Sequence, residues 1–138
     1  MSTIPITQSD LQASLPDTTS DIQTNHIRDE ISIIRDIHGI PHVKGSNTYD
    51  AFFGQGFATA QDRLWHMEFD RRKAFGRWAE LVGEPGLDSD ITMRKFQIED
   101  SVINDLTHLN AETMLMLTAY SHGVNAFIDT TSSLPVEY

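Results

Sequence analysis

The spacing of apolar residues between positions 53 and 67 constrains the fold more than any other feature. They recur at intervals of four, three, four and three residues, at Phe53, Phe57, Ala60, Leu64 and Met67. This spacing places them on one face of an α-helix. Trp65 and Phe69 lie off that face, so the helix is apolar on more than one side. We therefore expect it to be buried on two sides.

A β-hairpin is predicted before this helix. Ile31, Ile33 and Ile34 form a β-branched cluster, which favours a strand. Gly39 can take a positive φ and Pro41 interrupts a helix, so we predict strands at about 30–36 and 40–44 with a turn between them. An isolated hairpin is marginal in water. We therefore expect the two strands to belong to a larger sheet, which no later segment clearly supplies.

Three or four helices complete the predicted fold, which is of the α+β class. Asn47, Thr48 or Asp50 can cap the long helix, and residues 74–83 continue or restart it before Gly83-Glu84-Pro85-Gly86. A second helix is predicted from a cap at Asp88, Ser89 or Asp90 to about Leu106, with an apolar stripe at Ile91, Ile98, Val102 and Leu106. A third is predicted from a cap at Asn110 to about Ile128, with its core side at Met114, Leu117, Val124, Phe127 and Ile128.

Composition excludes several classes of function. The chain has 10 Lys and Arg against 20 Asp and Glu, a formal net charge of -10, which disfavours a nucleic-acid partner. No apolar run approaches the roughly 20 residues of a membrane span. Cysteine is absent, so disulfides, thiolate metal sites and cysteine nucleophiles are excluded. Residues 96–138 carry six acids and no Lys or Arg, which either a cationic partner surface or a solvated acidic face explains.

Residues 1–26 are polar and rich in Ser, Thr, Gln and Asp, and we interpret them as a flexible leader. They lack the basic start and the apolar stretch of a secretory signal. This favours a cytoplasmic protein, unless a signal has been removed or replaced.

Two glycines and two histidines are candidates for binding motifs. Gly54-Gln55-Gly56 begins a phosphate-binding pattern, but Thr59 stands where its third glycine belongs and the preceding element is predicted to be helical. Close approach of a neighbouring backbone explains the two glycines better. His38 and His42 have the i,i+4 spacing of metal ligands on a helix. Because this segment is not helical, a hydrogen-bonded His42 at the end of a strand is the favoured interpretation.

The remaining polar residues include candidate catalytic groups. Asp62, His66 and Asp70 share a helical face, which suits proton transfer but more often forms a surface ion network. None of the eleven serines lies in a G-x-S-x-G elbow or beside an obvious base. We therefore predict no catalytic residue, no cofactor site and no metal site within this chain.

Several long motifs, in the right order, resemble the penicillin acylase family, which includes the acyl-homoserine lactone acylases. Residues 35–43 resemble R-D-x-x-G-[IVM]-P-H-[IV], and residues 50–68 resemble D-A-x-F-G-x-G-[YF]-x-x-A-Q-D-R-L-x-Q-M, with His66 in place of the usual Gln. Residues 71–83 are similar to R-R-x-A-x-G-R-L-A-E-L-x-G. Asp90 with Arg94, then Ala119-Tyr120 and Gly123-Val124-Asn125-Ala126, match in order, and residues 134–138 resemble L-P-x-E-F.

The resemblance implies that residues 27–138 are the N-terminal portion of an α chain in an N-terminal-nucleophile hydrolase with an αββα sandwich. Such precursors cut themselves into an α and a β chain, and the first residue of the β chain is the catalytic Ser. The implied substrates are amides: acylated β-lactam nuclei, acyl-homoserine lactones or related N-acyl compounds. A structural calcium ion occurs in some complete members, and family precedent suggests the periplasm. The family's acyl-pocket residues and α-chain calcium ligand come after position 138, so neither is carried over.

The matched residues are interpreted as architectural. Arg35 and Asp36 would fix the hairpin together with Gly39, Pro41 and His42. A second set, Gln61, Asp62, Arg63, Arg71, Arg72 and Glu80, would form polar networks against a β chain. A free-standing acidic helical interaction protein is the alternative interpretation. It explains the helices and the acidic C-terminal part, but not the hairpin or the ordered motifs.

Overall fold

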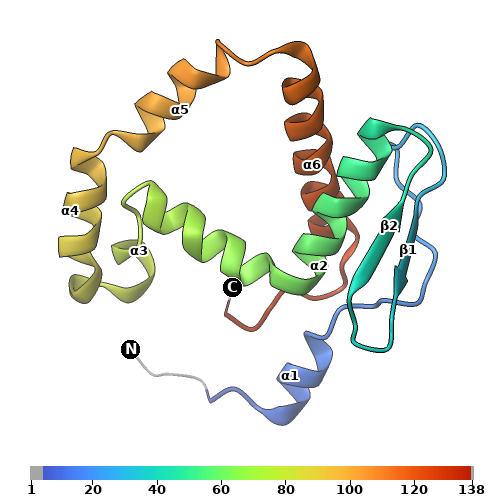
Figure 1. The fold of residues 1–138 in the computed structure, drawn as a ribbon. Helices are drawn as coiled ribbons and strands as arrows, with labels where there is room; N and C mark the ends of the chain where they lie inside the picture. Colours follow the sequence, from blue (N-terminus) through green and yellow to red (C-terminus); the bar gives the residue numbers. More distant parts are fainter. Residues whose placement is uncertain (1–4, 138) are drawn as a thin grey trace. The chain divides into compact units, whose positions relative to one another are not determined.

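A computed structural model describes residues 5–137 (Figure 1). Residues 1–4 of the predicted leader and Tyr138 of the last motif lie outside the described part. The chain divides into two compact units, residues 5–64 with 115–137 and residues 65–114. The described residues form a two-stranded antiparallel hairpin and six α-helices, so the predicted α+β class is confirmed.

The hairpin of the first unit consists of β1 (Ser32–Arg35) and β2 (Pro41–Lys44). Ile33 lies opposite Val43 in the antiparallel register. Gly39 has a φ of 77° in the turn, as its sequence position predicted. Both strands are shorter than expected, and within residues 5–137 the sheet has these two strands alone.

The long helix α2 (Thr48–Ala74) follows the hairpin. Asn47 caps it, because its side-chain oxygen accepts the backbone N–H of Asp50 at 3.0 Å. At Arg63 the backbone leaves helical geometry (φ -144°, ψ 27°), so α2 is two helices joined at a kink. The boundary between the two units lies next to the kink, between Leu64 and Trp65.

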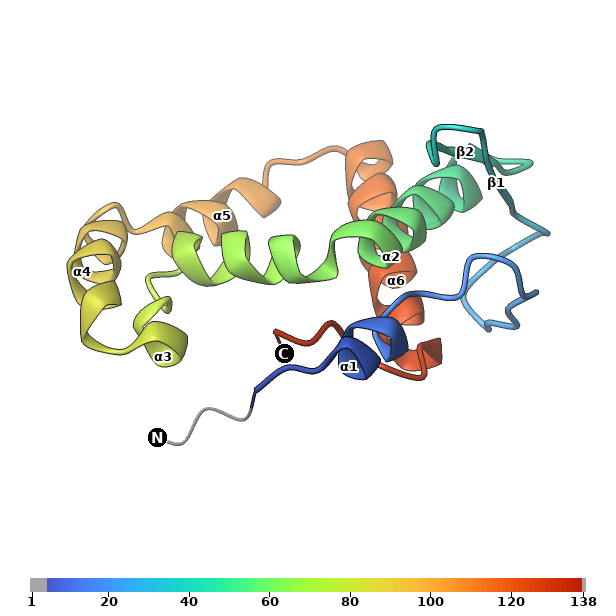
Figure 2. The same ribbon diagram turned by 90° about the horizontal axis from the view of Figure 1, so that it is seen from below.

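The N-terminal part of α2 is covered on two sides, as predicted. Its buried face carries Phe53, Phe57, Ala60 and Leu64, which form the core with α6 (Ala111–Thr130). The hairpin covers another side, where a Cβ added to Gly54 would lie 2.6 Å from a methyl group of Val43. Figure 1 and Figure 2 show this part of α2 against α6.

The contact between α2 and α6 depends on glycine. A side chain at Gly56 would collide with the carbonyl of Tyr120, and one at Gly123 would collide with the carbonyl of Phe53. The two backbones can approach this closely because neither glycine has a Cβ. The predicted role of Gly56 in close packing is therefore confirmed. Gly54 and Gly56 lie inside α2 rather than at its N-terminus, so the phosphate-binding alternative is wrong.

The core side of α6 differs from the prediction. Phe127 is buried as expected, with its ring perpendicular to that of Phe57 at 5.6 Å. Val124, also predicted on this side, is partly buried and packs against the core. The other buried residues of α6 are small, namely Ala119, Gly123 and Ala126. Three residues predicted to face the core are exposed instead: Met114, Leu117 and Ile128. Small residues occupy the contact because large side chains would hold the two backbones apart.

The second unit contains α3 (Ala79–Val82), a short 3-10 helix (Glu84–Gly86), α4 (Leu87–Lys95) and α5 (Ile98–Leu106). A single helix from about 88 to 106 was predicted, which is wrong. Gln97 adopts a left-handed conformation with a φ of 51° and separates α4 from α5. The predicted caps are also wrong, because α4 begins at Leu87 and places Asp90 inside the helix.

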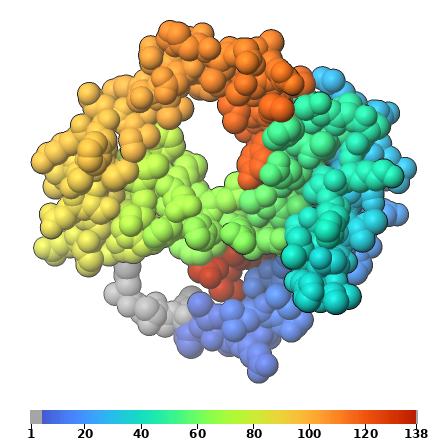
Figure 3. Space-filling model, viewed as in Figure 1, coloured from blue at the N-terminus to red at the C-terminus, as the bar shows by residue number. Residues whose placement is uncertain are grey.

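Three of the four residues of the apolar stripe predicted for these helices are exposed, and the fourth, Ile98, is half-buried. Ile91, Val102 and Leu106 are 52%, 44% and 43% exposed, and Phe96 is 68% exposed. Figure 3 draws α4 and α5 in yellow and orange. The buried residues of the second unit are Glu68, Gly76, Gly86 and Asp90. No large apolar side chain among its described residues is therefore fully buried.

The segment before the hairpin contains a short helix, α1 (Gln8–Ala13). Thr7 caps it through a reciprocal pair of hydrogen bonds with Asp10, which is a capping box. The flexibility of residues 1–26 stays a prediction. None of the described helices has the length and hydropathy needed to cross a membrane.

Candidate functional site

Arg35 joins the hairpin to α2 through a bidentate ion pair. Its two terminal nitrogens donate to the two carboxylate oxygens of Asp62 at 2.7 and 3.1 Å. They also donate to the side-chain oxygen of Gln61 at 2.7 Å and to the carbonyl of Gly39 at 3.0 Å. One guanidinium thus holds the strand, the turn and the helix together, and this geometry suits Arg rather than Lys.

Asp36 organises the turn of the hairpin. One carboxylate oxygen accepts the backbone N–H groups of His38 and Ile40 at 2.8 and 3.0 Å. The other lies 3.2 Å from Nε2 of His42, so the predicted hydrogen bond of His42 is confirmed. The His38 N–H, the His42 ring and the Ile40 N–H together lower the pKa of Asp36. Pro41, directly after the turn, opens β2.

A second polar network, in the other unit, is centred on Glu68. This carboxylate is buried and accepts two hydrogen bonds from Arg71, at 2.8 and 2.9 Å, and one from Arg72 at 2.5 Å. Arg72 also donates to Glu80 at 2.8 Å, and Arg77 donates to Glu80 at 2.8 and 3.1 Å. The network therefore ties α2 to α3.

The charges of this network hold one another ionised. The hydrogen bond from Arg71, followed by that from Arg72, lowers the pKa of Glu68, although burial opposes the shift. The hydrogen bond with Arg77 lowers the pKa of Glu80, and the same bond raises the pKa of Arg77. Such networks are typical of a structural role rather than of proton transfer.

Arg63 is the predicted site residue that the structure does not bring into either network. Its side chain is exposed, and it forms no hydrogen bond or ion pair with any of residues 5–137. The predicted contact of Arg63, and of the other network residues, with a β chain stays a prediction.

Two buried aspartates were not recognised as site residues from the sequence. The Asp50 carboxylate accepts the backbone N–H groups of Arg28 and Asp29 at 2.9 and 3.0 Å, and the side chain is fully buried. Asp90 accepts the backbone N–H groups of Trp78 and Ala79, both at 2.8 Å. From the residues alone both aspartates are predicted as helix caps, and both fall in family motifs, but neither pattern assigns these contacts. Their partners lie 21–22 and 11–12 residues away, too far for a local pattern to reveal them.

Asp62, His66 and Asp70 do not act as one ladder. Asp62 pairs with Arg35, while His66 lies 3.3 Å from Asp70, and both members of that pair are exposed. This agrees with surface ion pairs rather than a proton relay.

The described residues lack two features of an active site. Among them no serine hydroxyl is hydrogen-bonded to a histidine, although Tyr49 donates to or accepts from His122 at 2.6 Å. Residues 5–137 also contain no group of three or more His, Cys, Asp or Glu side chains that could hold a metal ion.

Comparison with known proteins identifies relatives of this arrangement. The penicillin amidase family model matches residues 30–138. Penicillin acylase 2 proenzyme from Pseudomonas sp. (strain SE83) is 42% identical over 128 residues, which is 93% of this chain and 16% of the relative. Penicillin G acylase from Escherichia coli is 37% identical over 106 residues, which is 77% of this chain and 12% of that protein.

Acyl-homoserine lactone acylase QuiP from Pseudomonas putida (strain KT2440) is 31% identical over 117 residues, covering 85% of this chain and 14% of the relative. Among solved structures, a thermostable penicillin G acylase from Alcaligenes faecalis matches with a TM-score of 0.71 and 28% identity. That match covers 79% of this chain and 60% of the other. The chain spans at most about a sixth of the length of these curated relatives. The matched residues include the hairpin, α2 and both polar networks, and the chain belongs to the penicillin amidase family.

Proposed function

We propose that this chain is the N-terminal part of the α chain of an amide-cleaving hydrolase, inactive without a β chain that supplies an N-terminal Ser. The observation that carries the proposal is the family match over residues 30–138. The proposed substrates are N-acyl compounds, either β-lactams with an acyl side chain or acyl-homoserine lactones. Relatives named for each of these substrates resemble the chain.

The distribution of polar and apolar side chains supports the proposal that a β chain completes the enzyme. In the unit of residues 65–114, charged Glu68 and Asp90 are buried, whereas large apolar residues such as Phe96 and Ile103 are exposed. Exposed apolar surface of this kind is typical of a segment that another part of the protein covers. We propose that a β chain covers it, and that Arg63, Arg71, Arg72 and Glu80 contribute polar contacts at its edge.

The chemistry would then reside outside the described residues. In the proposed mechanism, the Ser hydroxyl of the β chain attacks the amide carbon, and the α-amino group of the same Ser takes its proton. The amine leaves with a proton and water hydrolyses the acyl-enzyme. In this proposal the two polar networks stabilise the fold of this chain and do not contact the substrate.

The test compares residues 1–138 with the complete protein. Both would be incubated with penicillin G and with an N-acyl-homoserine lactone, and the released amine would be measured by derivatisation. We expect release by the complete protein, none by residues 1–138, and none when the first Ser of the β chain is replaced by Ala. Hydrolysis by residues 1–138 alone would refute the proposal. A complete protein that cleaves neither substrate would refute the substrate class.

A further inference from the structure

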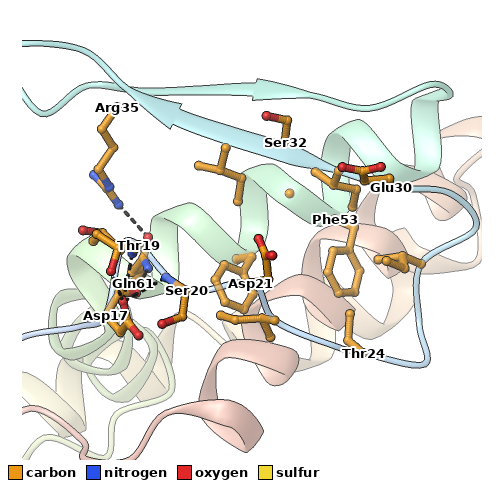
Figure 4. Close-up of a pocket in the computed structure, with 17 residues that line it drawn as sticks. Asp17, Thr19, Ser20, Asp21, Thr24, Glu30, Ser32, Arg35, Phe53 and Gln61 are labelled. Carbon is orange, nitrogen blue, oxygen red and sulfur yellow. Dashed lines mark hydrogen bonds between the residues drawn. The ribbon is translucent and has the colours of Figure 1, made fainter.

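A pocket of about 260 Å³ lies between the segment of residues 17–31 and α2, within the first unit (Figure 4). None of its lining residues belongs to residues 65–114. Its volume lies just below the roughly 300–1,000 Å³ that is usual for sites of drug-sized ligands. An occupant would therefore have to be small.

One side of the pocket is apolar. Phe53 and Phe57 from α2 line it, together with Ile31 and Ile33 from the hairpin and Ile27 before it. Phe53 and Phe57 belong to the buried core, so their positions are set by packing against α6. The apolar side is thus preformed, and it suits an aromatic or short alkyl group.

The other side of the pocket carries four charged side chains, two of which are already paired. Arg35 is neutralised by its bidentate bond with Asp62. The Asp17 carboxylate accepts the backbone N–H groups of Thr19 and Ser20 at 2.8 and 3.1 Å. Hydrogen bonding by the Ser20 side chain, and then by Thr19, lowers the pKa of Asp17.

Asp21 and Glu30 are the two that remain. Neither carboxylate forms a hydrogen bond or ion pair with any of residues 5–137. In the view of Figure 4, Asp21 lies between Gln61 and Phe53, and Glu30 lies above Phe53, next to the strand of the hairpin. The pocket therefore combines two uncompensated negative charges with an aromatic wall.

We propose that this pocket binds small organic ammonium ions that carry an aromatic ring or a short alkyl group. The ammonium group would lie near Asp21 and Glu30, and the apolar group would lie against Phe53 and Phe57. The inference is independent of the proposed amidase activity.

The test uses 2-phenylethylamine hydrochloride as the probe and titration calorimetry of the full-length protein at pH 7. We expect saturable binding with a stoichiometry of one, weakened by added salt because the charges are partly exposed. The neutral analogue 2-phenylethanol should bind more weakly. The double variant Asp21→Asn/Glu30→Gln should weaken binding of the amine by about threefold to tenfold, as expected for two exposed charge pairs.

A matched control removes two charges elsewhere. Asp105→Asn/Asp129→Asn lowers the net negative charge equally, but neither residue lines the pocket, so affinity should change less than twofold. Thr24→Trp, which would fill the pocket without changing its charge, should abolish binding. The proposal is overturned by an absence of saturable binding of the amine at concentrations up to about 10 mM. It is also overturned by equal affinity for the alcohol, or by equal losses in the two double variants.

Discussion

The carbonyl of Tyr120 in α6 occupies the space that a side chain at Gly56 in α2 would need. Neither backbone can move away easily, because the same contact is repeated between Gly123 and the carbonyl of Phe53. The packing of α2 on α6 is therefore sensitive to the smallest addition of volume.

Gly56→Ala is expected to lower the free energy of unfolding by about 1–3 kcal/mol, the usual cost of overpacking. Urea unfolding followed by far-ultraviolet circular dichroism measures the change. Gln55→Ala is the control, because residue 55 is the exposed neighbour on the same helix and should change stability by no more than about 0.5 kcal/mol. Equal stability of the two variants would contradict the close-packing argument.

Asp50→Ala is expected to cost about 1–3 kcal/mol, because it leaves the backbone N–H groups of Arg28 and Asp29 without their acceptor. Hydrogen exchange should become faster at these two amides before it changes elsewhere in α2. Asp50→Asn keeps one acceptor oxygen and should have an intermediate effect. Unchanged exchange at both amides in the Ala variant would show that the carboxylate does not hold this segment.

The coupling between Arg35 and Asp62 is expected to be about 0.5–1 kcal/mol, at the upper end of the range for partly exposed pairs, because two hydrogen bonds form. A double-mutant cycle with Arg35→Ala and Asp62→Ala measures it. The cycle with His66→Ala and Asp70→Ala is the comparison, since that pair is exposed and has one 3.3 Å contact. It should give less than about 0.5 kcal/mol. A larger value for the second cycle would reverse our ranking.

Glu68 should make stability depend on acid pH. Arg71 and then Arg72 lower its pKa below the ordinary value of 4.5, so the folded chain binds fewer protons than the unfolded chain as the pH falls toward that value. The stabilisation is complete above about pH 4.5 and is lost as the pH falls through the folded pKa.

Urea unfolding of the wild type and of Glu68→Gln between pH 3 and 7 tests this prediction. The wild type should be the more stable near pH 7, and the difference should shrink below about pH 4.5, because Gln does not titrate. A difference that stayed constant over this range would assign the stabilisation to packing rather than charge.

Arg63→Ala should affect assembly more than the fold of this chain. The side chain is exposed and has no hydrogen-bonding or ionic partner among residues 5–137, so truncation should leave the circular dichroism spectrum unchanged. If Arg63 contacts a β chain, precursor processing should slow and the melting temperature of the heterodimer should fall. Lys44→Ala, which removes another exposed cation, should have neither effect. Normal maturation of the Arg63 variant would end the interface proposal for this residue.

Local patterns explain which features could be predicted from the sequence. Asn47 and Asn110 were recognised as caps because each side chain reaches a backbone N–H only three residues later. Asp50 and Asp90 were missed as anchors because their partners lie 21–22 and 11–12 residues away. The site residues of the hairpin were found through family motifs, whereas their individual contacts required the structure.

Two errors in helix prediction have physical causes. No Gly or Pro marks the break between α4 and α5, since Gln97 adopts the left-handed conformation that usually favours glycine. On α6, periodicity favoured the large apolar residues, but the close approach at Gly123 selects small ones. Hydrophobic spacing alone does not reveal how far apart two backbones will pack.

The kink at Arg63 has a spectroscopic consequence. Both tryptophans of the chain, Trp65 and Trp78, lie on the C-terminal side of it, in the unit of residues 65–114. Intrinsic indole emission therefore reports on that unit, and loss of the hairpin and of the α2–α6 core could pass without a fluorescence signal. A melting curve recorded at a tryptophan wavelength would describe only one part of the molecule.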